Sequence, residues 1–210
     1  MKICLLLCLA AFSTGLAANG KPGKFDAYVL ALSWSPTYCE EQPKDREQCG
    51  KKLGLVLHGL WPQYSVGYPS FCTKEAYAPS QAQAFPELYP SEFLFEHEWE
   101  KHGTCSGLTQ AGYFQLSQAL KSKVAIPEAY QRPQKPFRTT ADGLKSDFTE
   151  ANPWLKEQAI APFCSGGGRF FKEIFVCLDK NGATASCSAD VVKSAAKSCG
   201  QKDFLVRNIK

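Results

Sequence analysis

The sequence has 210 residues, of which 44% are hydrophobic and 21% are charged, and this composition excludes an intrinsically disordered chain and a polytopic membrane protein. A chain of this length can bury enough surface to fold unaided into one sizeable domain. The formal net charge of +4 is too small for a polycation that coats nucleic acid, so an anionic ligand must be recognised at a local site.

The N-terminal segment 1–17 has the layout of a secretory signal peptide. Lys2 precedes an apolar run, residues 3–12, which is too short to span a bilayer and is followed by small residues. We place cleavage after Ala17, with Ala18 as the alternative. We therefore expect residues 18–210 to form one domain that is exported, without a membrane anchor, to the extracellular space, a periplasm or a vacuolar lumen.

Hydrophobic patterning predicts two strands in the first part of the mature chain. Residues 25–34 carry aromatic and aliphatic side chains on both alternating faces, which is typical of a strand buried on both sides. A second apolar run, residues 53–60, predicts a neighbouring strand. The polar segment 39–49 predicts a loop closed by its own pair of cysteines, and the proline-rich stretch 62–90 predicts a longer loop.

Helices and further strands follow in mixed order, which indicates an α+β domain. We expect Gly103 to end the first helix and Thr109 to cap the second. Residues 170–178 predict a strand followed by a turn, and residues 204–206 predict a last short strand. The helices are expected over residues 91–102, over residues 109–124 and around residues 140–151.

The cysteine count indicates an oxidising compartment. Cys4 and Cys8 lie in the signal segment, which leaves eight of the 10 cysteines in the mature chain. An even number in an exported chain favours disulfides, although eight thiols allow 105 pairings and spacing alone does not select one. Zinc ligation is the alternative, but it needs C-x2-C pairs or nearby histidines, and the cysteines show no C-x2-C spacing. The mature cysteines are Cys39, Cys49, Cys72, Cys105, Cys164, Cys177, Cys187 and Cys199.

The chain has only 3 histidines, and they lie in two short segments. His58 belongs to Leu-His-Gly-Leu-Trp-Pro-Gln, and His97 and His102 belong to His-Glu-Trp-Glu-Lys-His-Gly-Thr-Cys. An imidazole can both accept and donate a proton near neutral pH, so a pair of imidazoles is the minimum for coupled acid and base catalysis. A lone histidine such as His58 is more often a core residue, but beside a second histidine cluster it becomes a catalytic candidate.

The second segment places four ionisable side chains on one side of a helix. At about 100° per residue, His97, Lys101, Glu98 and His102 fall at roughly 0, 40, 100 and 140° around the axis. Trp99 falls on another side, and we expect it to pack in the core. Two imidazoles, one ammonium and one carboxylate suit chemistry on a charged substrate. The alternative is a solvated helix face with charge pairs four residues apart.

A zinc hydrolase is a further alternative, because two histidines and a glutamate also occur in the metalloprotease motif H-E-x-x-H. That motif spaces its histidines by four residues, whereas His97 and His102 are five apart. On a helix this rotates the two rings by about 140°, so they do not converge on one ion. Lys101 would also repel a cation. We therefore expect neither a metal nor a cofactor.

The two histidine segments resemble the catalytic segments of the ribonuclease T2 family. Residues 57–63 look like its first segment and residues 95–105 like its second, and the resemblance extends to residues 28–34 and 173–179. It implies an α+β fold with a central, mostly antiparallel sheet flanked by helices. It also implies a secreted endoribonuclease that cleaves single-stranded RNA as a monomer. A function of another class is a non-catalytic secreted binding protein or toxin on the same scaffold.

The resemblance also assigns chemical roles. It makes His102 the general base that deprotonates the ribose 2′-hydroxyl and His58 the general acid that protonates the leaving 5′-oxygen. Lys101 would neutralise charge on the phosphate, His97 would bind the phosphate, and Glu98 would stabilise the pentacovalent state or orient a neighbour. The first product would be a 2′,3′-cyclic phosphate, which water later opens to a 3′-phosphate. DNA lacks the 2′-hydroxyl and should not be cleaved.

Base binding and disulfide pairing follow from the same resemblance. Trp61 resembles the family's base-stacking tryptophan. An aromatic ring can serve this purpose because every nucleobase offers a π face. Gln63 stands where some members carry an acidic residue, and its amide both donates and accepts, so the base preference stays open. The partnering tyrosine is Tyr64 or Tyr68. The implied disulfides are Cys72–Cys105, Cys164–Cys199, Cys177–Cys187 and Cys39–Cys49.

Overall fold

The computed structural model describes residues 20–209 of the chain. The predicted signal peptide, residues 1–17, and both candidate cleavage positions lie outside this range. Among residues 20–209, no helix combines the length and the apolar character that crossing a membrane requires.

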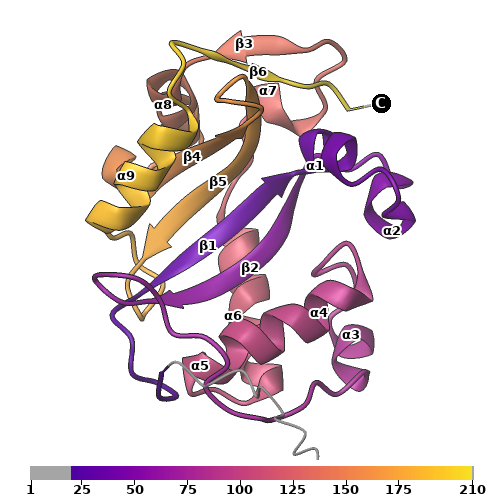
Figure 1. Cartoon of the computed structure of the whole chain (residues 1–210), viewed down its shortest axis with the longest axis vertical. Coiled ribbons are helices and arrows are strands. Elements are labelled where there is room, and N and C mark those ends of the chain that lie inside the picture. The colour runs from indigo at the N-terminus through magenta and orange to yellow at the C-terminus, as the bar shows by residue number, and fades with distance from the viewer. Residues whose placement is uncertain (1–19, 210) are drawn as a thin grey trace, which may run out of the picture.

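A sheet of six strands forms the centre of the structure (Figure 1). Its strand order is β2-β1-β5-β6-β3, and β4 pairs with β5 beside this path. The pairings are antiparallel except that of β5 with β6, which is parallel. The sheet and its flanking helices confirm the predicted α+β fold. The strands are β1 (Ala27–Trp34), β2 (Leu55–Gln63), β3 (Phe137–Thr139), β4 (Ile160–Ser165), β5 (Phe170–Leu178) and β6 (Phe204–Val206).

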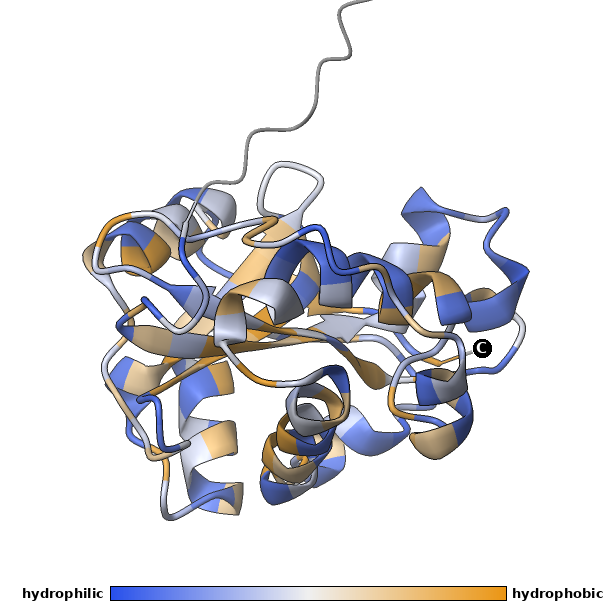
Figure 2. Ribbon diagram, turned by 90° about the horizontal axis from the view of Figure 1, so that it is seen from below, coloured by the Kyte–Doolittle hydropathy of each residue, from blue (hydrophilic) through white to orange (hydrophobic). Residues whose placement is uncertain are grey.

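Helices cover both faces of this sheet (Figure 2). α9 packs on one face through Val191 and Ala195, and α6 and α8 pack on the other through larger side chains such as Phe114 and Phe148. The helices are α1 (Ser35–Glu41), α2 (Arg46–Cys49), α3 (Ser80–Ala84), α4 (Glu92–Glu98), α5 (Thr104–Ser106), α6 (Gln110–Lys123), α7 (Glu128–Gln131), α8 (Ala141–Ala151) and α9 (Ala189–Ser198). A π-helix, Trp99–Gly103, joins α4 to α5, and a short 3-10 helix spans Glu157–Ala159.

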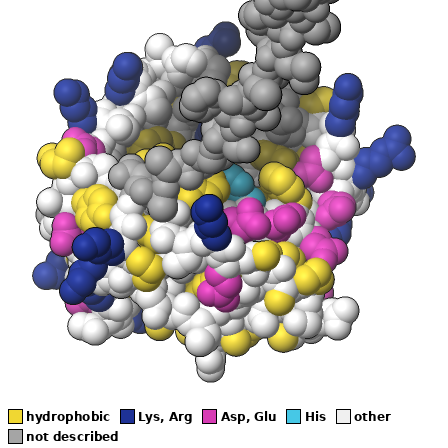
Figure 3. Space-filling model, turned by 60° about the horizontal axis from the view of Figure 1, so that its bottom comes forward, with side chains coloured by type: hydrophobic (Ala, Val, Ile, Leu, Met, Phe, Trp, Pro, Cys, Tyr) yellow, Lys and Arg dark blue, Asp and Glu magenta, His cyan; other side chains and the backbone are white. Residues whose placement is uncertain are grey.

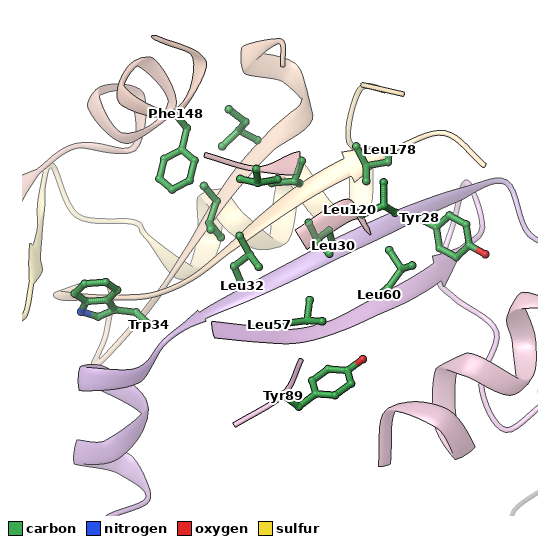
Figure 4. Packing of buried hydrophobic residues seen from close by; sticks show 14 of the residues in the cluster. Tyr28, Leu30, Leu32, Trp34, Leu57, Leu60, Tyr89, Leu120, Phe148 and Leu178 are labelled. Carbon is green, nitrogen blue, oxygen red and sulfur yellow. The ribbon is translucent and has the colours of Figure 1, made fainter. Parts of the chain in front are cut away.

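β1 contributes to both cores because its side chains alternate between the two faces of the sheet. Leu30 and Leu32 face the larger core (Figure 4). Val29 and Ala31 face the smaller core under α9. These residues are all buried, which confirms the prediction that this strand is covered on both sides.

Several predicted elements are present with small shifts at their ends. The strands expected over 170–178 and 204–206 coincide with β5 and β6. Thr109 caps α6 as predicted, because its side chain accepts a hydrogen bond from the backbone N–H of Gly112 at 3.2 Å. α8 corresponds to the helix expected around 140–151.

Two predicted loops contain regular structure. The prediction that residues 39–49 form a loop is wrong, because the segment holds the end of α1 and the whole of α2. Pro36 lies in the first turn of α1, where a proline loses no helical hydrogen bond, and Asp45 caps α2. The stretch 62–90 holds the short helix α3. Pro62 itself belongs to β2, an edge strand, where a missing N–H is tolerated.

The prediction that Gly103 ends the helix over 91–102 is also wrong. α4 continues through the π-helix into α5. Gly103 serves packing instead, because a Cβ at this position would overlap with the ring of Trp99. The helix ends at Gly107, whose φ of 78° is the left-handed conformation typical of a C-terminal glycine.

Four disulfides join the eight cysteines of residues 20–209 in the pairs that the family resemblance implies. Cys72–Cys105 attaches the middle of the long loop to α5, and beside it Phe71 N–H donates to the carbonyl of Lys101 at 2.9 Å. The hydrogen bond from Phe71 to Lys101 fixes the loop to the π-helix that carries His102. Because each of the eight cysteines in the described part of the chain is in a disulfide, none of them is available as a zinc thiolate. The pairs are Cys39–Cys49, Cys72–Cys105, Cys164–Cys199 and Cys177–Cys187.

Candidate active site

A cavity of about 410 Å³ collects the predicted catalytic and substrate-binding residues, except Tyr64. Figure 3 shows histidine in a hollow between hydrophobic side chains, with acidic and basic side chains nearby. Such a mixture of apolar surface and a few converging polar groups is typical of a ligand site. The predicted residues that line the cavity are His58, Trp61, Gln63, Tyr68, His97, Glu98, Lys101 and His102.

A β-bulge in β2 presents His58 to this cavity. β1 and β2 pair Ala31 with Gly59 and then Leu32 with Leu57, so His58 is the extra residue between two consecutive pairs. A bulge bends its strand and redirects a side chain, and bulges are frequent beside active sites. The backbone of the sheet therefore sets the direction of the imidazole.

Glu173 of β5 contacts the ring of His58 from the sheet side. Nδ1 of His58 lies 2.6 Å from Oε1 of Glu173 and 3.2 Å from Oγ of Ser33. Burial lowers the pKa of His58, but the hydrogen bond and charge of Glu173, with the charge of Glu98, outweigh it, so the pKa is raised above the ordinary value of 6.5. Sequence analysis missed Glu173. Its signal is a carboxylate inside a mostly apolar strand.

Glu98 and Trp61 are joined at the cavity. The indole Nε1 of Trp61 donates to Oε2 of Glu98 at 2.7 Å, and Glu98 is fully buried. Gly59 leaves the space for both, because a Cβ there would overlap with the carboxyl group and with the indole nitrogen. Burial raises the pKa of Glu98 to about 7, although His58, Trp61 and Lys101 each lower it. The carboxyl group can therefore hold a proton near neutral pH.

The π-helix changes the relation of the two histidines in the second segment. A π-turn holds more residues than an α-turn, so residues five apart, such as His97 and His102, are rotated by less than on an α-helix. The rotation of about 140° assumed a continuous α-helix and is too large for this segment. Lys101 and Glu98 line the same cavity as both histidines.

His102 is buried against Trp61. Its exposed fraction is 4%, and its ring stacks on the indole with centroids 5.2 Å apart. The ring of His58 meets the same indole edge-on at 5.1 Å. Burial, followed by the charges of Lys101, His97 and His58, holds the pKa of His102 well below 6.5. The two predicted acid–base histidines thus flank one indole and have pKa values shifted in opposite directions.

His97 is half-buried on the same helix and packs against Phe93 with ring centroids 5.8 Å apart. Burial first, then the charges of Lys101 and His58, lower the pKa of His97. Because His97 stacks on Phe93 and His102 stacks on Trp61, the two rings are held in separate environments. Within residues 20–209, no group of three or more His, Cys, Asp or Glu side chains is arranged to hold a metal ion.

Aromatic side chains from the sheet form one wall of the cavity. Phe175 of β5 meets Trp61 edge-on at 5.2 Å, and Phe163 of β4 packs on Phe175 at 4.3 Å. α9 and its N-cap residue form another wall of the cavity. Sequence analysis missed the residues of this wall because it did not predict α9. They are Ser188, Asp190, Val191 and Ser194.

The structure separates the two candidate tyrosines. Tyr68 lines the cavity, and the loop that carries it is tied to α9, because Gly67 N–H donates to Oδ2 of Asp190 at 3.2 Å. Tyr64 instead packs against the larger core and lines a neighbouring hollow. Gln63 borders both spaces, and its amide N–H donates to the carbonyl of Pro62 at 3.1 Å. Tyr68 is thus the tyrosine placed to face a ligand beside Trp61.

Two histidines with pKa values shifted in opposite directions, placed between aromatic walls, are suited to acid–base chemistry. The chain belongs to the ribonuclease T2 family, whose model matches residues 25–187. It is 44% identical over 205 residues to a ribonuclease of Aeromonas hydrophila, covering 95% of this chain and 93% of that protein.

Similar proteins also occur outside bacteria. Ribonuclease 1 of Arabidopsis thaliana is 29% identical over 211 residues, covering 87% of this chain and 88% of that protein. The fold resembles a crystal structure of an RNase MC1 variant in complex with 5′-UMP, with a TM-score of 0.67 at 21% identity, covering 86% of this chain and 97% of that one.

Proposed function

We propose that the cavity is the catalytic site of an endoribonuclease that cleaves single-stranded RNA by transphosphorylation. Membership of the ribonuclease T2 family and the similarity to a bacterial ribonuclease support an enzyme over a non-catalytic binding protein or toxin. The observation that carries the mechanism is that His58 and His102 flank the indole of Trp61 in one cavity, and their pKa values are displaced in opposite directions.

In this mechanism, His102 takes the proton of the ribose 2′-hydroxyl. Its lowered pKa keeps the imidazole neutral at mildly acidic pH, so the ring is ready to accept. The 2′-oxygen then attacks phosphorus and forms the new P–O bond. RNA supplies its own nucleophile, so a positioned base and acid are sufficient for this step.

His58 donates the proton that the departing 5′-oxygen needs. Its raised pKa keeps the ring protonated up to higher pH, and Nε2 is the nitrogen turned away from Glu173. The P–O bond to the 5′-oxygen breaks, and a 2′,3′-cyclic phosphate remains. Water then opens the cyclic phosphate to a 3′-phosphate, with the two histidines in exchanged roles.

Charge on the phosphate is stabilised by the remaining groups of the helix. Lys101 neutralises the equatorial oxygens, and His97 binds the phosphate. Glu98, which holds a proton near neutral pH, donates a hydrogen bond to a phosphate oxygen as the pentacovalent state forms. Its Oε1 is buried and, among the described residues, has no hydrogen-bond partner, which leaves it available for the substrate.

The aromatic part of the cavity takes the base. Trp61 and Tyr68 provide π surfaces on which a nucleobase can stack, and Gln63 provides an amide edge that both donates and accepts. Stacking discriminates weakly between bases, so we assign no base preference.

The test is digestion of RNA and of a DNA of the same sequence in excess EDTA. We expect RNA fragments that end in a cyclic phosphate and later in a 3′-phosphate, and we expect intact DNA, which has no 2′-hydroxyl. Loss of RNA cleavage on chelation, with recovery on adding zinc, would indicate a metallohydrolase. A biological effect that persists in both His58→Ala and His102→Ala would indicate a non-catalytic function.

We also propose that the enzyme is exported and acts as a monomer. The predicted signal peptide and the four disulfides support an oxidising compartment, and one copy of the chain contains every proposed site residue. Mass spectrometry of the exported protein should show a chain that starts at Ala18, or at Asn19 for the alternative cleavage. A full-length chain retained inside the cell would contradict export.

A further inference from the structure

Three neighbouring strands place Ser33, His58 and Glu173 next to one another. Ser33 of β1 pairs directly with Glu173 of β5, and His58 is the bulged residue of β2, which pairs with the other edge of β1. The hydrogen-bonded register of the sheet therefore sets the contact, and no mobile loop is involved.

The hydrogen bonds define which nitrogen of His58 carries which proton. A carboxylate only accepts hydrogen bonds, so the distance of 2.6 Å between Oε1 of Glu173 and Nδ1 of His58 places a proton on Nδ1. Ser33 Oγ donates to the same Oε1 at 2.8 Å. Nε2 is then the nitrogen that exchanges a proton with the substrate.

We propose that Glu173, supported by Ser33, is a positioning residue for His58, which fixes the ring and favours its protonated form for donation to the leaving oxygen. This inference rests on the proposed function, in which His58 is the general acid. Glu173 does not line the active-site cavity and acts through the imidazole.

The burial of Glu173 supports this role. The residue is only 8% exposed, and a buried carboxylate destabilises a fold unless hydrogen bonds or an opposite charge compensate. Both contacts of Oε1 go to Ser33 and His58. An apolar residue at this position of the strand would avoid the desolvation of a charge. The presence of Glu173 is therefore explained by its effect on His58, whose ring it holds and whose protonated form it favours.

Other ionisable groups also face His58. Burial lowers the pKa of His58, Glu173 and then Glu98 raise it, and Lys101 lowers it. Oε1 of Glu98 lies 4.0 Å from Nε2, and the charge of His58 in turn lowers the pKa values of His97 and His102. Glu173 is the carboxylate in hydrogen-bond contact with the ring, so removing its charge should change the pKa of His58 more than removing that of Glu98.

The variant Glu173→Gln tests the proposal, because glutamine keeps the shape and an accepting oxygen but removes the charge. NMR titration of the imidazole protons, simple in a chain with 3 histidines, should show a lower pKa for His58. The kcat for an RNA dinucleotide should fall about 10-fold or more, less than on removal of the imidazole itself. The alkaline limb of the pH–rate profile should move to lower pH.

Two further variants serve as controls. Glu41 borders a small hollow together with His58 and Glu173, but it pairs with Lys172 at 3.3 Å. Glu41→Gln should therefore leave the pKa of His58 and the alkaline limb unchanged. Ser33→Ala removes one hydrogen bond and keeps the charge, so its loss of kcat should be smaller than that of Glu173→Gln.

The proposal would be overturned if Glu173→Gln left both the pKa of His58 and the alkaline limb of the pH–rate profile unchanged. A fall in kcat alone would not rescue the proposal, because a purely structural role lowers activity without moving that limb. The NMR titration needs no enzymatic activity. A wild-type protein that fails to cleave RNA would contradict the proposed function, and the titration would still decide whether Glu173 controls the protonation of His58.

Discussion

Trp61 and Glu98 share a hydrogen bond of 2.7 Å between the indole Nε1 and the buried carboxyl group. The ring proposed to bind a base is therefore held by the group proposed to stabilise the phosphate. Because Gly59 leaves room for both, the sheet and the helix can meet at this point. In the proposed mechanism, this one contact would couple base binding to phosphate chemistry.

Two replacements of Trp61 should separate its stacking on a base from its hydrogen bond to Glu98. Trp61→Ala should weaken the binding of a nucleotide inhibitor by about 1–3 kcal/mol, because a stacking surface is lost. Trp61→Phe keeps an aromatic face but loses the donor to Glu98, so its Kd should change less while its kcat falls. Calorimetry and steady-state kinetics measure the two effects. An unchanged Kd in Trp61→Ala would leave Trp61 with a packing role only.

Removing either proposed acid–base group should slow the chemical step. His58→Ala and His102→Ala should each lower the single-turnover rate by at least ~100-fold, as expected for one general acid or base. His97→Ala is a matched control on the same helix, and it should raise KM more than it lowers kcat. A wild-type rate in either of the first two variants would remove that histidine from the mechanism.

The pH–rate profile should be bell-shaped and broader than for two ordinary histidines. The base His102 must be neutral, and its lowered pKa extends activity below 6.5. The acid His58 must be protonated, and its raised pKa extends activity above 6.5. NMR titration should assign the lower value to His102 and the higher to His58. The reverse order would contradict the assigned roles.

The buried carboxyl group of Glu98 should make stability depend on pH. Burial raises its pKa in the folded protein from 4.5 to about 7, so the protonated form contributes stability that is lost as the pH rises through about 7. Glu98→Gln removes the buried charge, so its Tm should exceed that of the wild type more at about pH 8 than at about pH 5. Each kcal/mol corresponds to roughly 2–4 °C for a chain of this size. A Tm difference that is the same at both pH values would contradict this account.

Strong local patterns made much of the fold predictable. Residues 25–34 and 170–178 are long, mostly apolar segments, and Thr109 is a good N-terminal cap, so their elements follow from local rules. β4 contains Pro162, which argues against a strand in sequence, yet it pairs with β5. α9 buries only Val191 and Ala195, so its apolar stripe is too narrow to stand out from the sequence.

The candidate site was predictable where its chemistry is carried by rare residue types. Three histidines in two segments indicated acid–base chemistry, and all three line the same cavity. Glu173 could not be identified in the same way, because its role depends on strand register and on the bulge at His58. The π-helix Trp99–Gly103 was also missed, because the helical periodicity applied to this segment assumed α-helical geometry.

The central claim is that His58 protonates the leaving oxygen while His102 deprotonates the nucleophile. The most direct measurement is the cleavage rate of an RNA dinucleotide whose bridging 5′-oxygen is replaced by sulfur, a leaving atom that needs no proton. We predict that His58→Ala cleaves this substrate at close to the wild-type rate, whereas His102→Ala stays slow. Recovery of His102→Ala instead, or of neither variant, would contradict the account.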